Sequence, residues 1–102
     1  MVSVIPNRSD IEGDILSRSL HPSLSDFDLL ELELRSAKPV EGFADLLSSR
    51  AGSKVEIAVK RQLLGTSPVE GARLRCRAYL GGPGAIFAEP DPAPGVFSVE
   101  RP

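Results

Sequence analysis

Apolar and polar residues alternate along several segments of this chain, and this period of two constrains the fold more than any other feature. In FDLLELELRSA (residues 27–37), Leu30, Leu32 and Leu34 share one side, and charged residues occupy the other. Residues 54–64 repeat the pattern with β-branched residues on the apolar side. Successive side chains of an extended strand point to opposite faces, so both segments are predicted strands with one buried face. A helix would wrap these leucines around its axis instead of aligning them.

Further strands are predicted from shorter or less regular patterns. Residues 72–80 alternate strictly, with small or apolar residues on the inner side. Residues 11–20 alternate imperfectly, and Gly13 marks a position where that strand bends or bulges. GGPG at 81–84 is a predicted hairpin turn, because it lacks the Lys-Ser/Thr that follows the glycines of a phosphate loop. Short strands are expected at 85–90 and at 1–6, where Pro6 ends the strand.

Residues 41–52 change period and predict one short helix. Phe43, Leu46 and Leu47 stand at helical spacing, and Gly52 suits the left-handed residue that follows a helix end. The expected order is three strands, a helix, and then two or three strands. This is the element order of a mostly β, five- or six-stranded OB-like barrel with one short helix between strands three and four. A small SH3-like barrel and an open α+β sheet are the alternatives.

The size of the chain predicts one domain. It has 102 residues, of which 9 are Gly and 9 are Pro, and these turn formers separate the apolar runs. Residues 1–90 are assigned to a single small barrel domain. Residues 91–102 form a Pro-rich tail, which is expected to be extended unless Val96, Phe97 and Val99 dock on the body.

A row of basic residues lies along one side of the predicted strand at 72–80, and it is the candidate binding site. Arg73, Arg75 and Arg77 alternate with the inner residues, and Tyr79 continues the row. Guanidinium groups bind phosphates and an aromatic ring stacks on bases, so the row suits single-stranded nucleic acid. The alternative is that the arginines pair with carboxylates of neighbouring strands without binding a ligand. The expected partners are Glu31, Glu33 and Glu56.

The sequence contains no recognisable catalytic or metal-binding set, so we predict no enzyme activity, no cofactor and no metal. His21 is the only histidine and lies in a turn, and Cys76 is the only cysteine and faces inward. Cys76 is therefore interpreted as a small buried residue, and His21 as a surface residue. Three carboxylates alternate on the predicted strand at 11–20 and its approach, where they are expected to form a solvated strand edge: Asp10, Glu12 and Asp14.

The charge distribution separates two hypotheses about function. The net charge of −2 disfavours a surface built entirely for nucleic acid or an anionic membrane. Acidic residues concentrate in 1–49 and basic residues in 50–102, which suits docking between complementary surfaces. We therefore expect a non-catalytic interaction module that docks on a protein partner or assembly. The alternative is single-strand nucleic-acid binding through the arginine row. With neither a signal-peptide pattern nor a long apolar run, a cytoplasmic location without membrane contact is expected.

Overall fold

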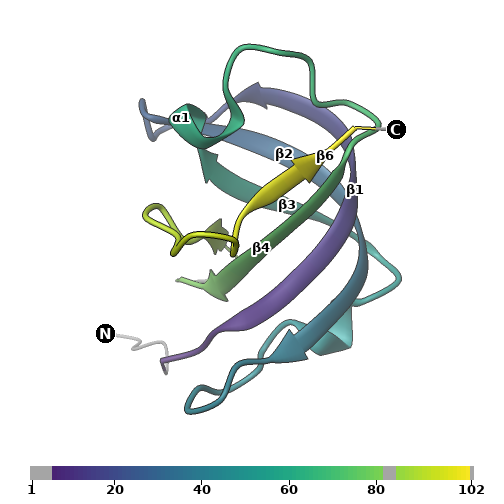
Figure 1. Cartoon of the computed structure of the whole chain (residues 1–102), viewed down its shortest axis with the longest axis vertical. Coiled ribbons are helices and arrows are strands. Elements are labelled where there is room, and N and C mark those ends of the chain that lie inside the picture. Colours follow the sequence, from purple (N-terminus) through teal and green to yellow (C-terminus); the bar gives the residue numbers. More distant parts are fainter. Residues whose placement is uncertain (1–5, 82–84, 102) are drawn as a thin grey trace.

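The computed structural model describes residues 6–81 and 85–101 (Figure 1). Strands dominate, and the helical elements are a 3-10 turn, η1, and a single turn of α-helix, α1. The strands are β1 (Ser9–Leu20), β2 (Phe27–Pro39), β3 (Lys54–Lys60), β4 (Arg73–Leu80), β5 (Ile86–Ala88) and β6 (Ser98–Glu100), and the helical turns are η1 (Ser48–Arg50) and α1 (Arg61–Leu64).

The strands close into a five-stranded barrel. Neighbouring strands follow the order β1-β2-β3-β5-β4, and β4 pairs back with β1. β3 and β5 are parallel, whereas the other pairs are antiparallel. β6 is an extra strand that pairs with β4. The predicted OB-like barrel is confirmed, and its closure excludes the open sheet that the sequence left as an alternative.

The inner faces of the strands form the core, as the alternation predicted. Leucines and β-branched residues turn inward from the longer strands, and small residues of β4 let the opposite walls approach. The outward positions between them carry most of the charged residues. The apolar core residues that β2, β3 and β4 contribute from their inner faces are Leu30, Leu32, Leu34, Val55, Ile57, Val59, Leu74, Cys76 and Ala78.

β1 bends at two irregular positions, and the first is the glycine that the sequence singled out. The register with β2 shifts between Glu12 and Gly13, and again between Ile15 and Ser17. A Cβ atom on Gly13 would lie 2.7 Å from the carbonyl oxygen of Glu33. Glycine is therefore required by close approach of the backbone of β2, and the predicted bend is confirmed.

The helix predicted over residues 41–52 is wrong over most of that range. Only η1 is helical there, and Phe43 is exposed. The Asp45 carboxylate accepts hydrogen bonds from the backbone N–H groups of Leu47 and Ser48, at 3.2 and 3.1 Å. These bonds stabilise a compact turn as an alternative to a continuous helix.

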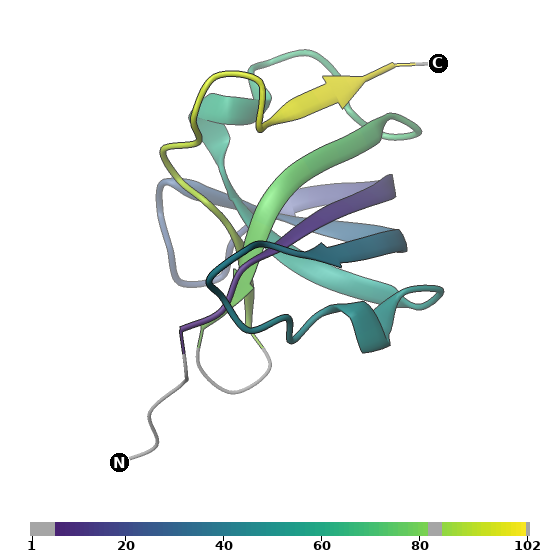
Figure 2. The ribbon, with the colours of Figure 1, turned by 60° about the horizontal axis from the view of Figure 1, so that its bottom comes forward.

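A different helical turn occupies the place between the third and fourth strands. The strand predicted at 54–64 ends at Lys60, and α1 follows directly. Leu64 of α1 is buried and packs against the core. α1 and η1 lie at opposite ends of the barrel (Figures 1 and 2). The OB-like position of the helix is thus filled by residues that the sequence assigned to a strand.

The C-terminal segment returns to the sheet. Residues of β6 pair with the first half of β4, and Phe97 and Val99 pack against the core. The tail was expected to be extended unless its apolar residues dock on the body, and Phe97 and Val99 do dock there. The predicted hairpin of β4 and β5 is confirmed by their antiparallel pairing. Most of the turn at 81–84 and most of the strand expected at 1–6 lie outside the described residues, and Pro6 is in no strand.

Candidate functional site

The arginine row lies on the outer face of β4, and each arginine faces a carboxylate of β1. The register places Asp10 opposite Arg77, Glu12 opposite Arg75, and Asp14 opposite Arg73. The inner residues between the arginines are buried in the barrel. We call this set of six side chains the β1–β4 charge ladder: Asp10, Glu12, Asp14, Arg73, Arg75 and Arg77.

Short ion pairs connect the two sides of the ladder. Arg77 Nε lies 3.0 Å from Asp10 Oδ1, and Arg75 Nε lies 2.7 Å from Glu12 Oε1. Arg73 binds two carboxylates, with Nη1 2.9 Å from Glu12 Oε2 and Nε 2.7 Å from Asp14 Oδ1, so Glu12 is shared with Arg75. The hydrogen bonds raise the pKa of the Arg73 and Arg77 guanidinium groups. Every arginine of the row is thus paired within the barrel wall.

The partners predicted for these arginines are wrong. The predicted partners were three glutamates of β2 and β3, whereas barrel closure places β4 between β1 and β5. Glu33 instead forms an ion pair with Arg35, at 3.1 Å. Glu31 and Glu56 lie directly opposite each other on β2 and β3. Among the described residues, neither has an ion-pair partner within 4.0 Å.

Tyr79 is engaged by groups of the same chain. Its ring stacks on Phe87 of β5, with centroids 5.6 Å apart and an interplanar angle of 22°. The Arg8 guanidinium lies 4.7 Å from the centroid of the Tyr79 ring and 5.3 Å from that of Phe43. Arg8 also forms an ion pair with Glu89 at 3.1 Å. The ring therefore already has stacking and cation–π contacts of the kind that a base would make.

A groove crosses the outer face of β2, β3 and β5. A hollow of about 280 Å³ has an apolar floor formed by Leu29, Ala58 and Phe87. Ala58 occupies an outward position between Ile57 and Val59, whose side chains point inward, yet Ala58 is only 2% exposed. A second hollow of about 270 Å³ adjoins the first, and the two share Glu56 and Ile86. We call the two hollows together the β2–β3–β5 groove.

His21 orders the loop that forms one wall of this groove. Its Nδ1 accepts hydrogen bonds from the backbone N–H groups of Ser23 and Leu24, at 3.1 and 3.0 Å. His21 and Pro22 both line the first hollow. The imidazole is at the surface of a turn, as expected, but its role as an acceptor for two loop amides was not predicted. A turn geometry of this kind has no distinctive residue spacing in the sequence.

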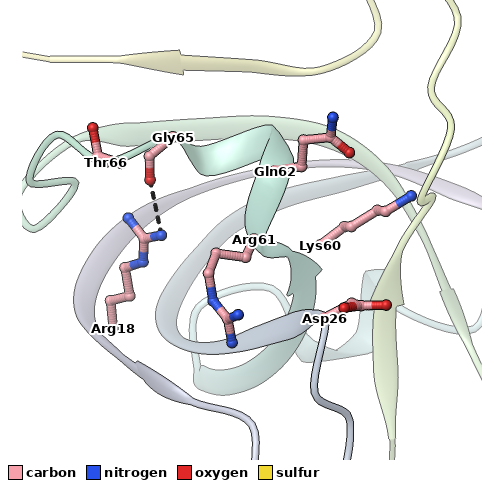
Figure 3. A pocket seen from close by; sticks show the side chains of 7 residues that line it. All are labelled: Arg18, Asp26, Lys60, Arg61, Gln62, Gly65 and Thr66. Carbon is pink, nitrogen blue, oxygen red and sulfur yellow. Dashed lines mark hydrogen bonds between the residues drawn. The ribbon is translucent and has the colours of Figure 1, made fainter.

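A third hollow opens at the end of the barrel beside α1 (Figure 3). Its volume is about 690 Å³. Beneath it lies Asp28, whose side chain is 5% exposed and binds Arg18 Nε at 2.7 Å and Arg61 Nε at 2.9 Å. We call it the α1 hollow, and it is lined by Arg18, Asp26, Lys60, Arg61, Gln62, Gly65 and Thr66.

The two arginines control the ionisation of Asp28. Burial by itself raises the pKa of this carboxyl group, but the hydrogen bonds and charges of Arg18 and Arg61 together outweigh burial. The pKa of Asp28 consequently lies below its ordinary value, and the group stays ionised at neutral pH. This cluster was not predicted from the sequence. One feature of the sequence could have indicated it, because Asp28 is a charged residue on the inner face of its strand, in line with Leu30.

Cys76 lies in the core of the barrel, as its inward position in the alternating pattern predicted. Cys76 is 4% exposed, and burial together with nearby carboxylates raises the pKa of its thiol to about 12. Within residues 6–81 and 85–101, no group of three or more His, Cys, Asp or Glu side chains could hold a metal ion. No helix among these residues has the length and apolar character needed to cross a membrane.

Comparison with known proteins adds no family to this description. No family model matches the chain, and neither the curated proteins nor the solved structures contain a significant match.

Proposed function

We propose that this protein is a non-catalytic interaction module that docks on a protein partner through the β2–β3–β5 groove. The proposal rests on the apolar floor of the first hollow, at Ala58. The neighbouring outward residues of the same strand, Glu56 and Lys60, are charged. Leu29 and Phe87 frame Ala58, and the hollow above it accommodates one apolar side chain of a partner. A small apolar depression within a polar surface is typical of the anchor sites of protein interfaces.

The charges beside the groove favour a basic residue in the partner. Glu31 and Glu56 face each other across β2 and β3 without an ion pair to any described residue. Like charges directly opposite each other destabilise a sheet, so a cation bound between them relieves the repulsion. Arg50 and Lys54 also line the second hollow and balance its formal charge, although neither forms an ion pair with these carboxylates. The proposed partner segment therefore has an apolar side chain next to a lysine or arginine.

The arginine row supports nucleic-acid binding less well than its sequence suggested. Binding to nucleic-acid phosphates requires protein cations that are free to displace the counterions condensed on the nucleic acid, whereas the three arginines of β4 already neutralise carboxylates of β1. Tyr79 is stacked on Phe87. Nucleic acid would have to compete with these internal contacts along the whole row.

A titration distinguishes the two functions. Fluorescence polarisation of labelled single-stranded DNA and RNA is measured against protein at low and high salt. We expect no saturable binding at micromolar protein. Salt-sensitive binding that is lost when Arg75 and Arg77 are both changed to glutamine would support the nucleic-acid function instead.

A peptide selection tests the groove directly. The folded protein is presented to a display library of random peptides, and enriched sequences are compared with those selected by variants. We expect an apolar residue adjacent to Lys or Arg, and loss of binding in Ala58→Glu. Ser17→Glu, which adds the same charge at an exposed position of β1, serves as the control. Equal binding by both variants would place docking elsewhere on the surface.

A further inference from the structure

The α1 hollow contains two arginines that are already held in place. Asp28 fixes both guanidinium groups through their Nε atoms, at 2.7 Å for Arg18 and 2.9 Å for Arg61. Each group has a second anchor on a backbone carbonyl. Arg18 Nη2 donates to Gly65 O at 3.0 Å, and Arg61 Nη2 donates to Phe27 O at 3.3 Å. Neither side chain therefore needs to lose much conformational freedom when it binds a ligand.

The same arrangement leaves donors available in the hollow. Among the described residues, the Nη1 groups of Arg18 and Arg61 have no hydrogen-bond acceptor. Lys60 and Thr66 also line the hollow, and their side chains have no hydrogen-bond partner in the described part of the chain. Figure 3 shows the two guanidinium groups on one side of α1 and the Lys60 ammonium on the other. The hollow thus combines oriented guanidinium donors with a mobile point charge.

The charge balance favours an anion. Three positive charges belong to the site, from Arg18, Lys60 and Arg61. Two negative charges oppose them, one from the buried Asp28 that binds both arginines and one from the exposed Asp26. Desolvation is limited because the hollow is open, so an anion gains attraction without full burial.

We propose that the α1 hollow binds the phosphoryl group of a small phosphomonoester. Guanidinium groups donate to tetrahedral oxyanions in a fixed geometry, and the flexible Lys60 side chain adds a positive charge from the other side of α1. The hollow is open and has a volume of about 690 Å³, which leaves room for an organic moiety beside the phosphoryl group. The site shares no lining residue with the β2–β3–β5 groove.

The test is a titration followed by two-dimensional amide NMR, with phenyl phosphate and inorganic phosphate as probes and chloride as the ionic-strength control. We expect saturable shifts centred on Lys60, Gly65 and Thr66, with tighter binding of phenyl phosphate. Lys60→Met is expected to weaken binding about threefold, because it removes one solvent-exposed positive charge from the site. Lys54→Met at the other end of β3 is the matched control, and its affinity is expected to be unchanged.

The other outcomes overturn the proposal in different ways. Inorganic phosphate that binds as tightly as phenyl phosphate would assign the hollow to the free ion. Equal affinities of Lys60→Met and Lys54→Met for phenyl phosphate would contradict the proposed site. The absence of a saturable shift with either probe would contradict it too. Thermal unfolding of both variants verifies that they are folded. The groove variant Ala58→Glu should retain phenyl phosphate binding, which separates this proposal from the proposed docking function.

Discussion

Arg77 on β4 lies directly opposite Asp10 on β1, and its Nε is 3.0 Å from Asp10 Oδ1. This pair is one rung of the β1–β4 charge ladder, in which each outward arginine faces an outward carboxylate. A shift of two residues between the strands would keep the apolar residues inside but leave charges at the ends of the ladder without partners. The ladder therefore specifies the register in which the barrel closes.

The first prediction concerns the energy of this pair. In a double-mutant cycle of Asp10→Asn and Arg77→Gln, we expect a coupling free energy of about 0.2–1 kcal/mol, measured by urea unfolding. The side chains are 50% and 33% exposed, so added salt should reduce the coupling. As a control, Asp10→Asn combined with Lys54→Met on another strand should be additive. A coupling near zero at low salt would show that the pair does not stabilise closure.

The fold was largely predictable because alternation reports directly on one-sided burial. β2, β3 and β4 were recognised from their own residues, and the order of elements then indicated the barrel. The helix predicted at 41–52 failed because helical spacing of apolar residues is a local pattern. It does not reveal that Asp45 bonds the amides of Leu47 and Ser48. The strand predicted through residue 64 failed at Lys60 for a similar reason, because alternation does not report where a strand stops pairing.

The candidate site was less predictable because its geometry depends on which strands are neighbours. The positions of the arginines on one face followed from the sequence, but their partners were sought on strands nearer in the chain. Barrel closure brings β1 beside β4, more than 50 residues away in sequence. Similarly, Asp28 was visible as a charge on an inner face. Its partners Arg18 and Arg61 come from the end of β1 and the start of α1, and only the folded barrel brings them together.

The second prediction is acid destabilisation through Asp28. Its pKa in the folded protein lies below the ordinary value of 3.8, so its stabilisation is present above that pH and is lost as pH falls through the folded pKa. We expect Asp28→Asn to lower the free energy of unfolding by about 2–4 kcal/mol at neutral pH, because two partly buried arginines lose their anion. Below pH about 4, the difference from wild type should shrink.

Urea unfolding across this pH range measures the effect of Asp28. Asp26→Asn removes an exposed carboxylate at the same end of the barrel and should leave the pH dependence unchanged. Asp14 and Asp45 also have lowered pKa values, so some acid sensitivity should remain in Asp28→Asn. A constant difference between Asp28→Asn and wild type down to the lowest pH would contradict the assigned ionisation.

The third prediction concerns the bend in β1. Gly13→Ala introduces a Cβ atom 2.7 Å from Glu33 O, which is a backbone atom that cannot move aside cheaply. We expect a loss of about 1–3 kcal/mol in the free energy of unfolding. Ser17→Ala, at the second irregularity but exposed, should change stability by less than about 0.5 kcal/mol. If both variants melt at the wild-type temperature, the close approach of β1 and β2 does not constrain residue 13.

The fourth prediction uses Cys76 as a reporter of barrel opening. Its thiol pKa is raised from 9.0 to about 12, chiefly by burial. The thiol is therefore protonated at pH about 8 in the folded protein, whereas an exposed cysteine is partly ionised there. We expect no reaction with Ellman's reagent in native buffer and rapid reaction in urea. Because the folded pKa is raised, the stabilisation is present below pH 9.0 and is lost as pH rises towards 12.

The dependence of the Cys76 reaction on the charge ladder is the informative part of this experiment. Cys76 lies opposite Ile11, between the rungs that Arg75 and Arg77 form with β1. If β1 and β4 separate locally, the thiol becomes accessible without global unfolding. Arg77→Gln breaks the same rung but keeps the Asp10 carboxylate, which itself raises the thiol pKa, and it should then increase the rate of labelling by more than its effect on global stability accounts for. Labelling that follows global stability alone would show that β1 and β4 separate only when the whole barrel unfolds.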